Sequence, residues 1–190
     1  DTLTGGEPLP VIAAKLYNQF MGNVIRYPKW GAAQPRWLSR DRYIIQVVPA
    51  QEITWFEGRS VVDLLSAPFT VSPNSDRMGY RLEGPPIRRS VIRELLSTAV
   101  TAGTVQVTGE GTLILLMADC QTTGGYPRIA QVAAVDIPLC AQLKPGDKVC
   151  FREISRMDAE KQYLHQEKQL EKLAVSVSVN HYRIESDDNN

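Results

Sequence analysis

A series of short apolar segments, separated by glycine and proline turns, runs from Arg42 to Arg152 and most limits the folds open to this chain. These segments have the length and the side-chain pattern of β-strands rather than of helices. The predicted strands are Tyr43–Val48, Pro68–Ser72, Gly79–Leu82, Thr104–Thr108, Thr112–Ala118, Ile129–Val135 and Lys148–Arg152. Short strands at this spacing are typical of an all-β barrel or sandwich.

Two segments interrupt the strand pattern. Trp55–Leu65 is predicted to form a short helix, with Phe56, Val62 and Leu65 as its apolar anchors. Ser155–Leu173 is the clearest helix of the chain, because leucines recur along it among many Glu, Lys and Gln residues. We therefore expect a mainly β fold with a C-terminal α-helix.

The start and the end of the C-terminal helix are predicted from local signals. Ser155 is expected to be the N-cap, with Asp158 three residues later completing a capping-box-like start. Beyond the helix, valine alternates with polar residues over Val175–Val179, which predicts an edge strand. The polar end, Ser186–Asn190, is expected to be disordered.

Composition excludes several classes of protein. The 190 residues are 43% hydrophobic and 22% charged, and 21 basic residues balance 21 acidic ones. A net charge of zero argues against a nucleic-acid binder with a strong basic field and against a polybasic membrane anchor. No apolar run approaches the length of about 18 residues that a transmembrane helix needs. We expect neither nucleic acid nor membrane as a partner.

The cysteines and histidines predict neither a disulfide nor a metal site. Cys120, Cys140 and Cys150 are odd in number and lack CxxC spacing, so we expect free thiols in a reducing cytoplasm. His165 and His181 lie far along a different segment, which argues against a zinc site.

The N-terminal part differs from the rest. Asp1–Leu9 has the composition of a loop, and the first methionine is Met21. We interpret the chain as a fragment of something longer. A short helix is expected over Val11–Met21, followed by an irregular connector.

The first stretch that can carry chemistry is Ser72–Gly84. On a strand, Met78, Tyr80 and Leu82 would share one face that suits a core. Arg77, Gly79 and Arg81 would share the other face, where two guanidinium groups beside a glycine suit the capture of a carboxylate or a phosphate. The alternative is a half-exposed strand whose arginines are solvated or paired with Asp76 or Glu83.

The second stretch is Asp119–Ala130, directly after the most apolar strand. Asp119 is expected at a rim, and the Thr-Thr-Gly-Gly sequence at Thr122–Gly125 offers hydroxyl and backbone N–H donors. Glycines allow the backbone alternation that forms an anion-binding nest. The alternative is an ordinary hairpin loop, since the sequence is neither a Walker A nor a GxGxxG motif.

Several blocks of the chain, in order, resemble one family. They are Ser75–Pro85, Val105–Val107, Ile114–Leu116 with Asp119, Gln121–Ala130, Ala141–Leu143, Pro145–Asp147 and Phe151. These blocks are similar to one family that includes KipA, the 5-oxoprolinase C subunit and allophanate hydrolase subunit 2. The family is biotin-dependent carboxyltransferase-like. The resemblance runs from about Tyr43 to Ile154 and implies the C-terminal portion of such a protein. Residues 1–40 would then be the end of a missing first domain and a connector, residues 41–155 a cyclophilin-like β-barrel, and residues 156–180 the C-terminal helix and tail.

The resemblance implies three functional settings. The first, which we favour, is a subunit of an ATP-dependent 5-oxoprolinase that opens 5-oxo-L-proline to L-glutamate. Its cofactor would be ATP with Mg. Its partners would be a protein like KipI or the 5-oxoprolinase B subunit, together with one like the A subunit. The alternatives are a KipA-type regulator that binds a KipI-like inhibitor of a histidine kinase, and the carboxyltransferase domain of a urea carboxylase, where biotin would take part. The fragment alone is expected to be inactive and cytoplasmic.

Roles for individual residues follow as hypotheses. Arg77 and Arg81 would supply cationic groups to the developing charge, and Asp119 would orient substrate or a metal-bound water. No protein metal ligands are expected. The residues expected to bind the carboxylate or amide substrate are Asp76, Gln121, Thr122, Thr123, Gly124, Gly125 and Tyr126. A structural alternative is that Asp76 or Asp119 pairs with the arginines only to hold the rim together.

Overall fold

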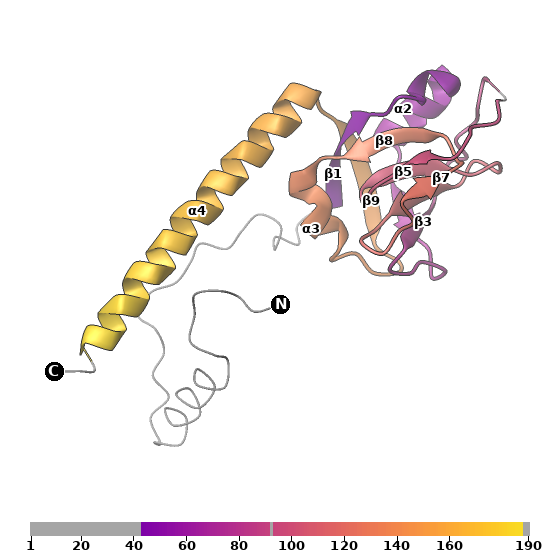
Figure 1. Cartoon of the computed structure of the whole chain (residues 1–190). Helices are drawn as coiled ribbons and strands as arrows, with labels where there is room; N and C mark the ends of the chain where they lie inside the picture. The colour runs from indigo at the N-terminus through magenta and orange to yellow at the C-terminus, as the bar shows by residue number, and fades with distance from the viewer. Residues whose placement is uncertain (1–42, 92, 188–190) are drawn as a thin grey trace. The chain divides into compact units, whose positions relative to one another are not determined.

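The β-strands of the computed structural model close into a barrel, confirming the expected mainly β fold with a C-terminal helix (Figure 1). The structure describes residues 43–91 and 93–187. The expected first domain over residues 1–40, with its helix at Val11–Met21, lies outside these residues. The barrel strands are β1 (Tyr43–Pro49), β2 (Phe69–Val71), β3 (Gly79–Glu83), β5 (Thr104–Val107), β6 (Leu113–Leu116), β8 (Arg128–Val132) and β9 (Lys148–Glu153).

The strand order around the barrel is β1-β8-β5-β6-β3-β2-β9, and β9 returns to β1. This last pair is parallel, from Tyr43 beside Val149 to Val47 beside Glu153, whereas the other neighbours run antiparallel. Two short strands, β4 (Thr98–Ala99) and β7 (Thr123–Gly124), form a separate antiparallel ladder. Since the barrel is closed, its strands leave no unpaired sheet edge.

The core lies inside the barrel and follows the two-residue period of the strands. Leu113 and Leu115 on β6 and Val105 and Val107 on β5 are at most 1% exposed. Gln106 is also buried, but it lies on the opposite face of β5 from Val105 and Val107. The loop-borne Ile87, also buried, approaches Gly111, whose positive φ forms the turn before β6.

The short helix α2 (Gly58–Ser66) lies close to its predicted place, but its anchors differ in part. Leu64 is buried and Leu65 packs against the core, whereas Val62 is exposed, so its prediction as an anchor was wrong. The helix begins at Gly58 rather than Trp55, and its core-facing side runs through Val61, Leu64 and Leu65, which leaves Val62 outside it. Phe56 is buried but precedes the helix, after the turn η2 (Ile53–Trp55).

The long helix α4 (Arg156–Asp187) has the predicted start. The Ser155 hydroxyl accepts a hydrogen bond from the Asp158 N–H at 3.1 Å, which confirms the N-cap. The edge strand predicted over Val175–Val179 was wrong, because the helix continues through it. The hydroxyls of Ser176 and Ser178 donate to the carbonyls four residues earlier, so these serines are compatible with a helix.

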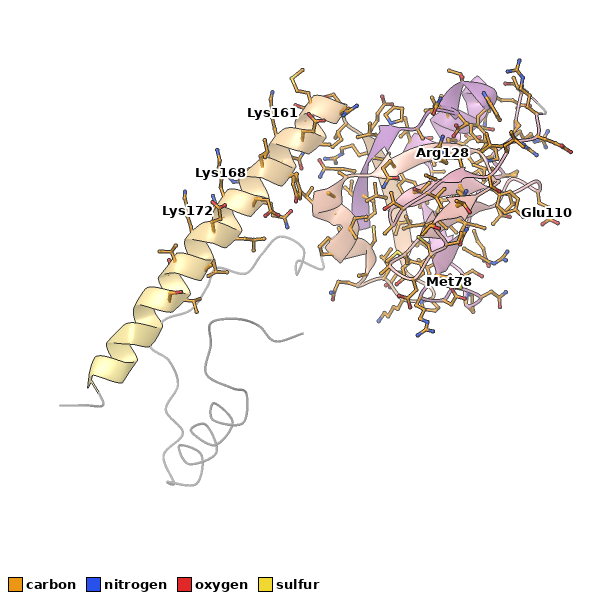
Figure 2. The ribbon with its side chains drawn as sticks, viewed as in Figure 1. Met78, Glu110, Arg128, Lys161, Lys168 and Lys172 are labelled. Carbon is orange, nitrogen blue, oxygen red and sulfur yellow. The ribbon has the colours of Figure 1, made fainter. Side chains whose placement is uncertain are left out.

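The end of α4 also differs from expectation. Ser186 and Asp187 belong to the helix instead of a disordered tail, while residues 188–190 lie outside the described part of the chain. The exposed Lys161, Lys168 and Lys172 line one side of α4, as Figure 2 shows, in agreement with the solvated face expected there. Within the described residues, no helix combines the length and the apolar character that crossing a membrane requires.

Paired amides anchor the first turns of α4 to the barrel. Gln46 of β1 and Gln162 of α4 exchange two side-chain hydrogen bonds of 3.0 and 3.1 Å. The buried Asp136, on the turn η3 (Ala134–Asp136), accepts hydrogen bonds from both the backbone and the side-chain nitrogen of Gln46. Sequence patterns did not indicate this network, because its members lie in separate parts of the chain.

All three cysteines are free. Cys140, on the short helix α3 (Ile137–Cys140), is fully buried. Burial, together with the nearby charge of Asp136, raises the pKa of the Cys140 thiol to about 12. The thiol therefore stays protonated near neutral pH and acts as a small apolar core residue.

The closed core makes the first testable prediction. Leu115→Ala removes a side chain that is 0% exposed and should lower the free energy of unfolding by about 3 kcal/mol, because a cavity replaces its packing. Urea unfolding monitored by circular dichroism measures the loss. The matched control is Leu96→Ala, since Leu96 is 88% exposed and should lose less than about 0.5 kcal/mol. Equal losses in the two variants would contradict the buried position of Leu115.

Candidate functional site

The predicted rim forms where β3 begins and β6 ends. The antiparallel register places Gly79 opposite Leu116, so the residues before β3 meet those after β6. The Asp119 N–H donates to the Arg77 carbonyl at 3.3 Å, and the Arg77 Nε lies 3.1 Å from an Asp119 carboxylate oxygen. The structure thus brings Arg77 and Asp119 together as an ion pair at the barrel end.

The Arg77–Asp119 pair is largely open to solvent. The Arg77 side chain is 87% exposed and that of Asp119 is 53% exposed. Exposed pairs contribute little to stability, because water screens them and ordering two side chains costs entropy. Both groups remain accessible to a ligand, so the pairing alone does not make them structural.

Asp76 shapes the turn that enters β3. Its carboxylate accepts hydrogen bonds from the backbone N–H of Met78 at 2.8 Å and of Gly79 at 3.1 Å. Met78 therefore precedes the strand and is 47% exposed, so the expectation that it shares a core face with Tyr80 and Leu82 was wrong (Figure 2). Asp76 uses its carboxylate to shape the turn that carries Arg77.

Arg81 lies on β3 and is exposed. The face over Gly79, expected to be open between Arg77 and Arg81, is occupied by Ile114 of the neighbouring strand. A Cβ atom at Gly79 would be 3.1 Å from the Ile114 side chain. The two arginines therefore do not form a single pocket across Gly79.

The Thr-Thr-Gly-Gly segment is a short ladder rather than a nest. Thr123 and Gly124 form β7, which pairs with β4, and the Thr122 carbonyl accepts a hydrogen bond from the Val100 N–H at 2.9 Å. Neither Gly124 nor Gly125 has a positive φ, so the backbone alternation of an anion-binding nest is not formed here. Exposed side chains of this segment, including those of Gln121, Thr122, Thr123 and Tyr126, remain available for binding.

A second ion pair, Glu52 with Arg128, lies beneath this segment and was not predicted. Arg128 binds both carboxylate oxygens of Glu52, at 2.6 and 2.7 Å. The Glu52 side chain is only 5% exposed and that of Arg128 only 19%. Arg128 also donates to the Ala99 carbonyl on β4 at 3.3 Å, so the pair holds the β4–β7 ladder against β8. Figure 2 marks Arg128 on the barrel.

Arg128 shifts the titration of its partner. The hydrogen bonds from Arg128 lower the pKa of the Glu52 carboxyl below its ordinary value of 4.5 against the opposing effect of burial. Arg128 stood within the block Gln121–Ala130 that carried the family resemblance, but no sequence signal linked it to Glu52. Only proximity in the fold identifies that pair.

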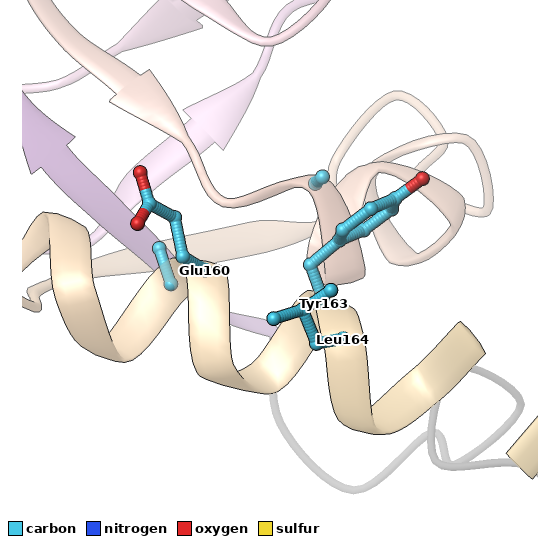
Figure 3. A pocket seen from close by; sticks show the side chains of 5 residues that line it. Glu160, Tyr163 and Leu164 are labelled. Carbon is cyan, nitrogen blue, oxygen red and sulfur yellow. The ribbon is translucent and has the colours of Figure 1, made fainter. Parts of the chain in front are cut away.

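A groove of about 470 Å³ lies apart from the predicted residues (Figure 3). It is lined by Ala134, Ala159, Glu160, Tyr163 and Leu164, from η3 and α4. Its lining is mostly apolar, and its carboxylate, Glu160, already pairs with Arg156 at 2.9 Å. The groove therefore offers no convergent polar groups, and the rim with the adjoining segment remains the candidate site. Among the described residues, no three His, Cys, Asp or Glu side chains gather as metal ligands would.

Known proteins share both the sequence and the fold of this chain. Residues 3–153 match the family described as carboxyltransferase domain, subdomain A and B. The chain is 40% identical over 120 residues to the 5-oxoprolinase C subunit of Haemophilus influenzae, covering 63% of this chain and 39% of that protein. It is 39% identical over 144 residues to the 5-oxoprolinase C subunit of Escherichia coli, covering 76% of this chain and 45% of that protein. The chain thus spans less than half the length of these curated relatives.

The fold also has a solved counterpart. The structure superposes on the urea carboxylase of Kluyveromyces lactis with a TM-score of 0.63 and 23% identity, over 67% of this chain and 12% of that one. At this identity the likeness concerns the fold alone.

The Glu52–Arg128 pair makes a prediction about stability and pH. Glu52→Gln should lower the free energy of unfolding at pH 7 by about 2 kcal/mol, because Arg128 loses its charged partner in a mostly buried position. The folded pKa of Glu52 lies below the unfolded value, so its contribution is complete above about pH 5 and is lost as the pH falls through the folded pKa. Thermal unfolding between pH 7 and pH 3 measures the difference between variant and wild type, which should narrow at the acid end. The exposed Glu110→Gln is the control. A gap that stays constant with pH would refute the pairing.

The Arg77–Asp119 pair at the rim, in contrast, should contribute little to stability. Asp119→Asn should change the free energy of unfolding by less than about 0.5 kcal/mol, since both partners are exposed. Urea unfolding is again the measurement. A loss above about 1.5 kcal/mol would instead support a purely structural role for Asp119 at the rim.

Proposed function

The chain belongs to the carboxyltransferase domain family, subdomains A and B, and on that premise we propose that it is part of the C subunit of a 5-oxoprolinase and binds 5-oxo-L-proline. The observation that carries this proposal is the 39–40% identity to two proteins of that name. The candidate rim and the Thr-Thr-Gly-Gly segment both lie within the matched residues 3–153. The chemistry of the site then has to suit a small lactam that bears a carboxylate.

The exposed groups support such a substrate. Arg77 offers a guanidinium to the substrate carboxylate, and the Asp119 carboxylate 3.1 Å away holds that guanidinium in place. The hydroxyls of Thr122 and Thr123 are donors on the adjoining segment and suit the lactam carbonyl. Arg81, on the exposed face of β3, adds positive charge farther along the strand that Arg77 precedes.

Opening a lactam requires activation of a poor electrophile, and the donors at the rim would stabilise negative charge developing on its carbonyl oxygen. ATP and Mg would supply the phosphoryl chemistry in the complete complex. The described residues do not suit ATP or Mg. They form no carboxylate cluster for a metal, and the Thr-Thr-Gly-Gly segment precedes a strand instead of a helix whose N-terminus could bind phosphate. We therefore assign this chain to substrate binding and place nucleotide binding elsewhere in the complex.

The partners follow from the same proposal. The relatives are named as one subunit of 5-oxoprolinase, which implies further subunits. We propose that these are a protein like KipI or the B subunit, together with a protein like the A subunit. They would meet this chain in the complete enzyme, where the nucleotide is bound.

Two other functions compete with this proposal. The first is carboxyl transfer to an amide with biotin as the carrier, which the description of the matched family favours. Turnover that depends on biotin instead of ATP and oxoproline would select this alternative. The second is a KipA-type regulator. Binding to a KipI-like partner, with neither oxoproline-dependent ATP hydrolysis nor biotin-dependent carboxyl transfer, would select it.

The test replaces the arginines in the full-length protein with its partner subunits. Arg77→Ala should raise the KM for 5-oxo-L-proline at least tenfold, because it removes a charged contact worth about 1.5 kcal/mol or more, and Arg81→Ala should raise it by a smaller factor, because Arg81 acts only through its charge. Oxoproline-dependent ATP hydrolysis is the measurement. Arg156→Ala is the matched control, because Arg156 is equally exposed but lies on α4. Unchanged turnover in both rim variants would remove the arginines from the mechanism.

A further inference from the structure

The outer face of β5, beneath the Thr-Thr-Gly-Gly segment, carries a buried polar side chain to which the candidate site gives no role. Gln106, in the middle of β5, is 1% exposed, and its neighbours Val105 and Val107 are fully buried. A primary amide in such a place is costly unless its hydrogen bonds are satisfied. The Gln106 amide is therefore expected to form hydrogen bonds with another buried part of the structure.

The partner is the Thr-Thr-Gly-Gly segment. The Gln106 Nε2 donates to the Tyr126 carbonyl at 3.0 Å. Gly124 packs on the same amide, since a Cβ atom at Gly124 would be 2.7 Å from the Gln106 Nε2 and 3.4 Å from its Oε1. Gln106 thus touches the segment at two places, one on each side of Gly125.

This contact explains the glycine at position 124. Gly124 has no positive φ, so its backbone conformation does not call for glycine. The obstacle to a side chain is the Gln106 amide, which would have to shift and so disturb its hydrogen bond to the Tyr126 carbonyl. Gly125 differs, because the nearest atom to a Cβ atom there would be 3.6 Å away, an ordinary contact.

The outer side of the segment is held differently. The β4–β7 ladder and the hydrogen bond from Val100 to the Thr122 carbonyl fix its edge, and Arg128 fixes β4 through the Ala99 carbonyl. The side chains of Thr122 and Thr123 stay exposed. The inner side of the segment therefore depends on Gln106, while its outer groups remain accessible for binding.

We propose that Gln106 is a positioning residue for the substrate-binding segment Thr122–Tyr126. It sets the depth of the segment above the barrel core through the Tyr126 carbonyl and through its contact with Gly124. This inference rests on the proposed function in one respect, namely that the segment binds the oxoproline substrate. Gln106 itself is too deeply buried to touch that substrate.

A double-mutant cycle in the 190-residue chain tests the positioning. The variants are Gly124→Ala, Gln106→Ala and the two combined, and Gly109→Ala is the control because nothing lies within 4 Å of a Cβ atom there. Hydrogen exchange is followed at the Val100 amide and at the amides of residues 121–126. Gly124→Ala alone should speed exchange at least about fivefold, since the new methyl group collides with the Gln106 amide.

In the Gln106→Ala background, the same Gly124→Ala change should alter exchange less than about twofold, because the collision is gone. The control should match the wild type. An equal effect of Gly124→Ala in both backgrounds, or no effect in either, would overturn the proposed contact. This cycle requires no enzymatic activity, so its result is independent of the reaction.

The link to substrate is tested in the full-length protein with its partner subunits. Gln106→Met keeps the length of the side chain but cannot donate to the Tyr126 carbonyl. It should raise the KM for 5-oxo-L-proline about fivefold, the factor for one lost hydrogen bond, with kcat within about twofold of wild type. An unchanged KM would overturn the substrate-positioning role. A wild-type complex without oxoproline turnover would overturn the proposed function, and the exchange cycle would still decide the contact.

Discussion

The parallel pairing of β1 with β9 is the contact on which the rest of this structure depends. It joins the first and the last strand of the barrel over the register Tyr43–Val149 to Val47–Glu153. A parallel pair cannot be made by a hairpin and needs a longer connection. In this barrel the connection from β1 to β9 contains all the other strands. Closure removes the free edges of the sheet and encloses the apolar side chains of β5 and β6.

Closure also positions the candidate site. The antiparallel register of β3 and β6 brings Arg77 next to Asp119, although the two residues lie far apart in sequence. Beside this rim, the Thr-Thr-Gly-Gly segment rests on one buried amide and one largely buried ion pair, those of Gln106 and of Glu52 with Arg128. The exposed side chains of this segment are thus held in place by buried polar contacts beneath it. These contacts fix the position of the side chains and leave them accessible to a ligand.

Some features of the fold and the site were readable from local pattern. The strand segments, the capping of α4 by Ser155 and the family blocks all depend on residues close in sequence, and they were predicted. Two failures have different causes. Val62 points outward because the face of α2 that packs on the core runs through Val61, Leu64 and Leu65, and the prediction took Val62 in place of Val61. Met78 left the core because Asp76 bends the backbone before β3, and hydrophobic periodicity does not mark a turn of this kind.

The sequence by itself determined a mainly β fold followed by a helix, and it placed the functional candidates in two stretches, Ser72–Gly84 and Asp119–Ala130. Periodicity and turn residues carry that information locally. Only the tertiary structure decided which residues meet: Arg77 with Asp119, Glu52 with Arg128, and Gln106 with Gly124. The physical reason is that each of these contacts joins separate strands or loops, so it exists only once the barrel has closed and fixed their register.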